Sequence, residues 1–135
     1  MFGFYRIAAC VPVVRVADPA FNAEQILNVA RQAVSEHSSV LLFPELALSS
    51  YSCGDLLHNG TLLDGVEQAV GRICRETAGL DSILAIGAPV RYQNRLFNAV
   101  LILQRGKILG IVPKTHLPNY REFYEKRYFS SGYGI

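Results

Sequence analysis

The stretch SVLLFPE, residues 39–45, places an acidic side chain directly after a short apolar run. The run predicts a buried strand. Proline has no backbone N–H to donate to a sheet, and Pro44 stands at the end of the strand, where this missing hydrogen bond costs the least stability. A second stretch, GIVPK at residues 110–114, repeats the order of strand, proline and charge with the opposite sign. If the two strands are neighbours in one sheet, a carboxylate and an ammonium group meet in one pocket.

The hydrophobic pattern around these stretches alternates between strands and helices. Helices are predicted from Asn22, with Gln25 in a capping-box arrangement, and from Thr61. Apolar runs predict strands at residues 6–14, 39–43, 82–90, 96–104 and 107–112. Strand, helix, strand and helix followed by three closely connected strands indicate an α/β protein with an antiparallel component.

Two of these strands indicate that the chain is one part of a larger domain. Residues 39–43 and 98–103 are mostly apolar, so both faces of their sheet should be covered. Two helices can hardly cover two faces. We therefore expect the 135 residues to need further structure against the second face.

Composition excludes several classes of protein. The net charge is +2, and the eight Lys and Arg of residues 81–135 form no run of five, so no nucleic-acid partner is expected. The sequence contains no stretch of about 18 apolar residues, so no segment is expected to span a membrane. The cysteines at positions 10, 53 and 74 fit no zinc spacing, which indicates a reduced, cytoplasmic protein without a metal site.

The charged residues after the two prolines are the first candidates for chemistry. Glu45 is either a buried general base or a strand-end carboxylate that faces water. Lys114 either stabilises a developing oxyanion or forms a structural ion pair. The residues alone leave both choices open.

Further candidates lie near these two. Glu122 either pairs with Lys126 at a helical spacing of four residues or, like Glu125, orients Lys114. Cys53 is a candidate nucleophile because it follows Glu45 by eight residues, but a reactive cysteine needs a lowered pKa.

Four motifs, in this order, resemble the nitrilase superfamily. FPEL at 43–46 is similar to its glutamate motif, and PK at 113–114 followed by LP at 117–118 is similar to its lysine motif. YSCGDLL at 51–57 and LPNYREFYEKRYF at 117–129 resemble the glutaminase domain of glutamine-dependent NAD synthetases. The resemblance extends from the first predicted strand to residue 129.

The resemblance implies part of an αββα sandwich with a mixed sheet, and part of a Glu-Lys-Cys site. Glu45 would be the general base, and Lys114 would stabilise the tetrahedral intermediate formed when a cysteine attacks the side-chain amide of glutamine. The products are a thioester and ammonia. Tyr51, Tyr120 and Phe123 match the aromatic residues that bind glutamine.

The resemblance also implies what these residues do not supply. Glu122 or Glu125 would be an auxiliary glutamate, but the nucleophilic cysteine of the family lies several tens of residues beyond the lysine motif. Residues 1–135 are therefore expected to be the N-terminal part of a glutaminase domain that is inactive alone. In the synthetases a second domain uses ATP and magnesium to amidate deamido-NAD, and no cofactor is expected for this segment.

The expected partners are glutamine, the synthetase domain and further copies of the protein, because family members assemble through the sandwich. Two alternatives stay open at this point. The chain could belong to another nitrilase-type amidase, or it could be a non-catalytic half-domain that serves in assembly.

Overall fold

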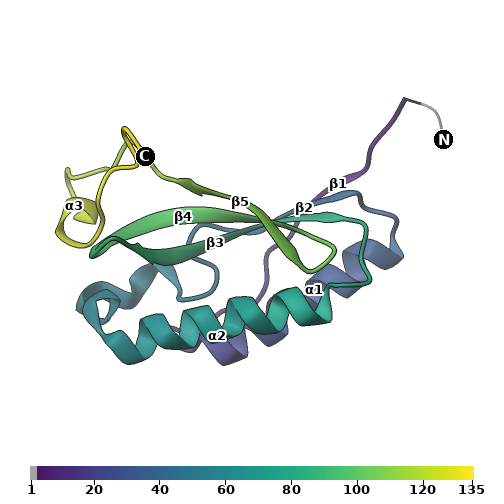
Figure 1. Cartoon of the computed structure of the whole chain (residues 1–135), viewed down its shortest axis with the longest axis horizontal. Coiled ribbons are helices and arrows are strands. Elements are labelled where there is room, and N and C mark those ends of the chain that lie inside the picture. Colours follow the sequence, from purple (N-terminus) through teal and green to yellow (C-terminus); the bar gives the residue numbers. More distant parts are fainter. Residues whose placement is uncertain (1–2) are drawn as a thin grey trace.

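The computed structural model describes residues 3–135 and contains one five-stranded sheet with two long helices on one face (Figure 1). The strands lie side by side in sequence order and form a mixed sheet, because β1, β2 and β3 are parallel whereas β3, β4 and β5 are antiparallel. Their bounds are β1 (Ile7–Ala9), β2 (Val40–Leu42), β3 (Ile83–Tyr92), β4 (Arg95–Gln104) and β5 (Lys107–Pro113). The predicted α/β class with a mixed sheet is confirmed.

The parallel strands are connected by helices α1 (Pro19–Ser35) and α2 (Gly60–Glu76). The carboxylate of Asp18 accepts the Phe21 N–H at the start of α1, where Pro19 occupies the first turn. At the start of α2, the side chain of Asn59 accepts the Thr61 N–H. Each helix therefore begins at a short polar side chain that satisfies a free backbone donor.

The predicted helix start at Asn22 is wrong, because Asn22 lies inside α1 and is fully buried. Its side-chain oxygen accepts the Arg15 N–H, and its amide donates to the carbonyls of Arg15 and Leu48. The side chain thus ties two loops to the helix rather than capping it.

The predicted strand at 6–14 is paired only over Ile7–Ala9. Its partner β2 is equally short and is followed by Pro44, which has no N–H to continue a ladder. Val11 and Val13, beyond the paired part, are largely exposed.

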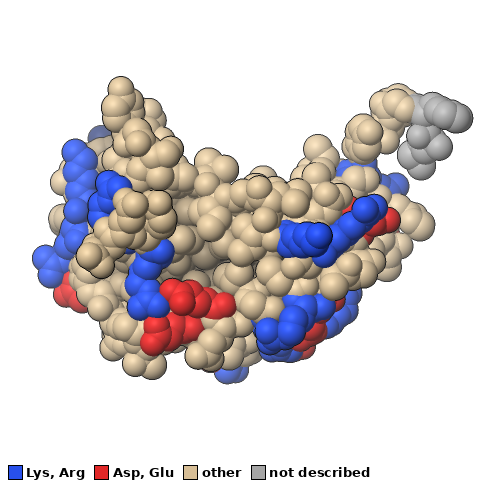
Figure 2. Space-filling model, viewed as in Figure 1, with Lys and Arg blue, Asp and Glu red and all other residues tan. Residues whose placement is uncertain are grey.

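The hydrophobic core lies between the helices and one face of the sheet. On the opposite face Leu42 and Val112 remain more than half exposed, as does Ile7 at the sheet edge. In Figure 2 the upper surface between the two ends of the molecule is hollowed and carries few charged side chains. The described residues therefore cover one face of the sheet and leave the second open, as the apolar strands predict.

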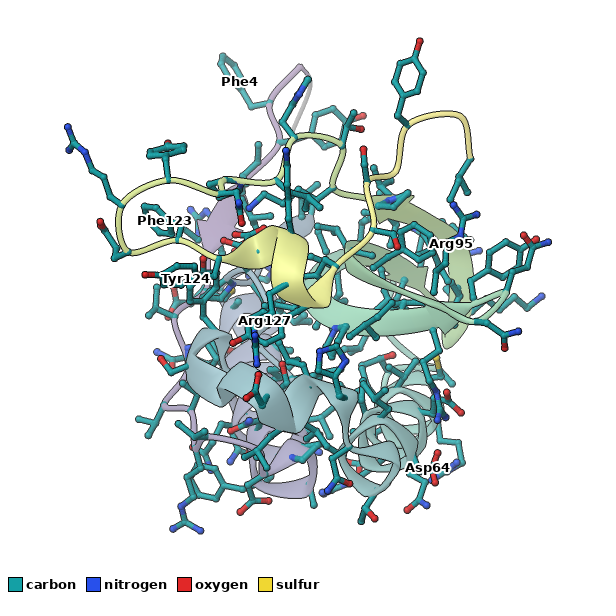
Figure 3. The ribbon with its side chains drawn as sticks, turned by 90° about the vertical axis from the view of Figure 1, so that its left-hand side faces the viewer. Phe4, Asp64, Arg95, Phe123, Tyr124 and Arg127 are labelled. Carbon is teal, nitrogen blue, oxygen red and sulfur yellow. The ribbon has the colours of Figure 1, made fainter. Side chains whose placement is uncertain are left out.

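The segment after β5 folds back against the segment after β2. The Arg127 guanidinium in α3 (Glu125–Tyr128) bonds the Asp55 carboxylate in the 3₁₀ segment η1 (Tyr51–His58) at 2.9 Å between Nε and Oδ1. Figure 3 shows Arg127 pointing from α3 toward η1. The predicted helical pair of Glu122 and Lys126 is wrong, because α3 begins only at Glu125.

Candidate functional site

Glu45 lies in the loop that leaves β2 and crosses over β3. The Phe43 N–H donates to the Ala85 carbonyl at 2.9 Å, and the Leu48 N–H donates to the Gly87 carbonyl at 3.2 Å. A Cβ on Gly87 would lie 2.5 Å from the Leu46 nitrogen. The missing side chain at position 87 therefore lets the loop close on the sheet.

The loop brings Glu45 to Lys114, with 2.7 Å between Glu45 Oε1 and Lys114 Nζ. The sequence brought these two groups together only on the condition that their strands are neighbours. That condition is not met, because β3 and β4 lie between β2 and β5. The side chains still meet because the loop passes over Gly87, and because the Lys114 N–H stays bonded to the Asn98 carbonyl of β4 at 2.7 Å.

Glu125 is the second carboxylate at Lys114. Its Oε1 accepts from Lys114 Nζ and from the Tyr51 hydroxyl, each at 3.0 Å, and its side chain is only 4% exposed. Within residues 3–135 its buried Oε2 has no hydrogen-bond partner. Glu122 is exposed and forms no bond to Lys114 in the same range, so the geometry distinguishes the two candidate auxiliary glutamates.

The two carboxylates determine the charge of Lys114. Burial alone lowers the pKa of the Lys114 amine, but the hydrogen bonds and charges of Glu45 and Glu125 outweigh burial and raise it. Lys114 is therefore an ammonium group at neutral pH, and it can donate to a developing negative charge.

The predicted aromatic residues separate into two groups. Tyr51 lines a pocket of about 250 Å³ together with Glu122, Tyr124 and Glu125. Tyr120 and Phe123 do not line this pocket but form an edge-to-face pair with 5.9 Å between ring centroids. Figure 3 shows Phe123 on the loop that precedes α3.

Tyr51 is expected to ionise at a higher pH than an ordinary tyrosine. Burial, the hydrogen bond to Glu125 and the nearby negative charges raise its pKa from 10.0 to about 12. An alkaline absorbance titration should show a tyrosine ionisation near pH 12, and Tyr51→Phe should remove that step. The folded chain favours the neutral phenol of Tyr51. The Tyr51 hydroxyl therefore makes its full contribution to the free energy of unfolding below pH 10, and this contribution is lost as the pH rises toward 12. A titration that Tyr51→Phe leaves unchanged would contradict the Tyr51–Glu125 bond.

The sequence pattern of the carbon-nitrogen hydrolase family matches residues 6–135. The chain belongs to the carbon-nitrogen hydrolase family. It is 44% identical to the glutamine-dependent NAD(+) synthetase of Mycobacterium tuberculosis over 132 residues, which are 98% of this chain and 19% of that protein. The chain thus spans about a fifth of the length of the curated relatives it matches.

Solved structures show the same fold. A glutamine-dependent NAD(+) synthetase from Cytophaga hutchinsonii superposes with a TM-score of 0.87 at 24% identity, over 94% of this chain and 22% of that one. An amidase from Nesterenkonia sp. superposes with a TM-score of 0.82 at 22% identity, over 95% of this chain and 48% of that one.

The cysteines of this carbon-nitrogen hydrolase sequence do not resemble activated nucleophiles. The buried Cys53 thiol donates to the Ser49 carbonyl at 2.9 Å, and burial raises its pKa. Burial also raises the pKa values of Cys10 and Cys74. Since an attacking thiol needs a lowered pKa, the geometry gives no support to Cys53 in that role.

Two residues of this candidate site were missed in the sequence analysis. Asn98 donates its side-chain amide to Glu45 Oε1 at 2.5 Å, and Gly87 makes room for the Glu45 loop. A polar side chain inside the apolar stretch 96–103 was the available signal for Asn98. Gly87 carried no signal, because a glycine within a strand pattern has several explanations.

Among the residues described, no helix is long and apolar enough to cross a membrane, and no acidic, histidine or cysteine cluster could hold a metal.

Proposed function

We propose that this chain supplies the base and the oxyanion-stabilising cation of a glutamine-hydrolysing amidase, as part of a glutamine-dependent NAD synthetase. The 2.7 Å contact of Glu45 Oε1 with Lys114 Nζ carries the proposal, because it places a proton acceptor and a cation at one point. The 44% identity to the Mycobacterium tuberculosis synthetase supports the choice of glutamine over another amide.

In the proposed reaction a cysteine outside these 135 residues attacks the side-chain amide carbon of glutamine. Glu45 takes the thiol proton and returns it to the departing nitrogen, so that ammonia leaves and a thioester remains. Lys114 donates to the oxyanion of the tetrahedral intermediate. Glu45 then deprotonates a water that attacks the thioester carbon. As the C–S bond breaks, this proton passes from Glu45 to the departing thiolate, so that glutamate leaves and the cysteine and the free base are regenerated. A mutant of the Nesterenkonia amidase supports the cysteine step, because the acetamide moiety of fluoroacetamide adds covalently at its active-site cysteine.

The proposal assigns the aromatic residues to glutamine. Tyr51 lies at the pocket beside Glu125, where it would border the amide end of the substrate. The partly exposed pair of Tyr120 and Phe123 would close over glutamine when it binds. ATP, magnesium and deamido-NAD would act in a separate synthetase domain, in a cytoplasmic homo-oligomer. The open face of the sheet would pack against the remainder of the amidase domain.

The test is ammonia release from glutamine by a polypeptide that joins this chain to a cysteine-bearing remainder of the domain. Glu45→Gln should lower the rate by about 10²–10⁴-fold, the usual contribution of a positioned acid or base. Glu36→Gln is the matched control, because this exposed carboxylate at the end of α1 lies outside the pocket and forms no ion pair among the described residues. Equal rates for Glu45→Gln and the control would refute the proposal. So would ammonia release by this chain alone that Cys53→Ala abolishes.

A further inference from the structure

Asn98 contacts both charged members of the site from a single position on β4. Its side-chain amide donates to Glu45 Oε1 at 2.5 Å, and its backbone carbonyl accepts the Lys114 N–H at 2.7 Å. The residue is only 4% exposed and lies opposite Pro89 of β3, on strand β4, which is paired on both sides, with β3 and with β5. The point from which both contacts are made is therefore rigid.

The two donors at Glu45 bond the same oxygen. Oε1 accepts from Asn98 Nδ2 and from Lys114 Nζ, whereas no hydrogen bond within residues 3–135 reaches Oε2. The Glu45 side chain is 44% exposed, so it would rotate freely if nothing held it. With Oε1 held twice, Oε2 is the oxygen that remains able to take a proton.

The chemistry of the Asn98 side chain suits this task. An amide nitrogen carries two donors and no charge, so it can hold a carboxylate without competing for its proton. A lysine or arginine in its place would add a second cation beside Lys114. The orientation of the amide is also fixed, because its oxygen would repel the Glu45 carboxylate.

We propose that Asn98 is a positioning residue that holds Glu45 Oε1 against Lys114 and thereby presents Oε2 as the proton acceptor. The assignment of a proton to Oε2 rests on the amidase function proposed above. The placement of Glu45 against Lys114 does not, and the two can be tested separately.

The first experiment uses this chain alone and needs no enzymatic activity. The chain has three lysines, at positions 107, 114 and 126, and only Lys114 forms an ion pair among the described residues. NMR spectra of a chain with isotope-labelled lysine therefore contain one signal from the site and two from lysines outside it. The signal that disappears in Lys114→Arg belongs to Lys114. In the parent chain Glu45 and Glu125 raise the pKa of the Lys114 amine against the effect of burial, so Lys114 should titrate at a higher pH than an ordinary lysine.

In Asn98→Ala and Asn98→Ser the Lys114 titration should shift to lower pH, because Glu45 is no longer held at the ammonium. Thr77→Val is the matched control, because it removes another buried hydrogen bond, from Thr77 Oγ1 to the Ile73 carbonyl at the end of α2. The control should leave the Lys114 titration unchanged. An unchanged titration in folded Asn98 variants would overturn the proposal. Unfolding of both Asn98 variants would overturn it too, since Asn98 would then belong to the fold rather than to the site.

The second experiment measures glutamine hydrolysis in the polypeptide that includes the cysteine-bearing remainder. Asn98→Ala should lower kcat by on the order of tenfold to a hundredfold and leave KM unchanged, because a small displacement of a catalytic group reduces the rate without removing a substrate contact. A loss equal to that of Thr77→Val would overturn the proposed role of Oε2. If the parent polypeptide hydrolyses no glutamine while the lysine titration shifts as expected, the amidase function fails and the placement of Glu45 by Asn98 stands.

Discussion

Lys114→Met is expected to lower the free energy of unfolding by about 3 kcal/mol, the lower end of the range for removing one partner of a buried ion pair. The variant leaves Glu125 buried, with a 4% exposed side chain and only the Tyr51 hydroxyl to compensate its charge. We place the effect at the lower end because Lys114 itself is 31% exposed. Chemical denaturation at neutral pH measures the loss.

A second substitution shows whether the uncompensated carboxylate causes this loss. Glu125→Gln in the Lys114→Met background removes the charge, so the double variant should recover a large part of the stability. Lys126→Met is the matched control, because Lys126 is exposed and forms no ion pair in residues 3–135, and it should change stability little. A double variant no more stable than Lys114→Met would contradict the explanation.

Gly87→Ala is expected to destabilise the chain by about 1–3 kcal/mol, the usual cost of forcing a methyl group into a filled space. The added Cβ would lie 2.5 Å from the Leu46 nitrogen and still closer to the Pro44 carbonyl oxygen. Because both atoms belong to backbone, the Glu45 loop must move away from β3. Denaturation measures the loss, and a crystal structure of the variant should show a longer distance between Glu45 Oε1 and Lys114 Nζ.

Gly110→Ala separates this steric effect from the general effect of replacing a glycine in a strand. Gly110 lies in β5 of the same sheet, and a Cβ there would have nothing within 4 Å. This variant should be as stable as the parent chain or slightly more stable, since alanine restricts the unfolded chain. If the two variants lose the same stability, the contact of the Glu45 loop with Gly87 is not the cause.

The elements of the fold could be predicted where one local signal was sufficient. The apolar strands predicted at 82–90, 96–104 and 107–112 correspond closely to β3, β4 and β5. The start of α1 was predicted wrongly because Asn22 and Asp18 are both residues that cap helices, and only the loops around Leu48 show that Asn22 has another partner. The short β1 could not be foreseen, because its length depends on where β2 ends.

The candidate site could be predicted only in part, because half of it depends on contacts between distant segments. Glu45 and Lys114 were marked by a shared local pattern of strand, proline and charge. The choice of Glu125 over Glu122 required the position of Tyr51, which is 74 residues away in the sequence. The contact of Asn98 with Glu45 could be predicted only from the path of the loop over Gly87, and no local sequence pattern encodes that path.

The mixed sheet also has a consequence for the order of folding. The strands β3, β4 and β5 follow one another through tight turns, so they can associate early with little loss of chain entropy. The contact of Glu45 with Lys114 joins residues 69 positions apart, and it also requires the parallel strand β2 to dock through a helical crossover. We therefore expect the site to be among the last parts of the chain to form. A local unfolding event that breaks these late-forming contacts would separate Glu45 from Lys114 while the antiparallel strands stay paired.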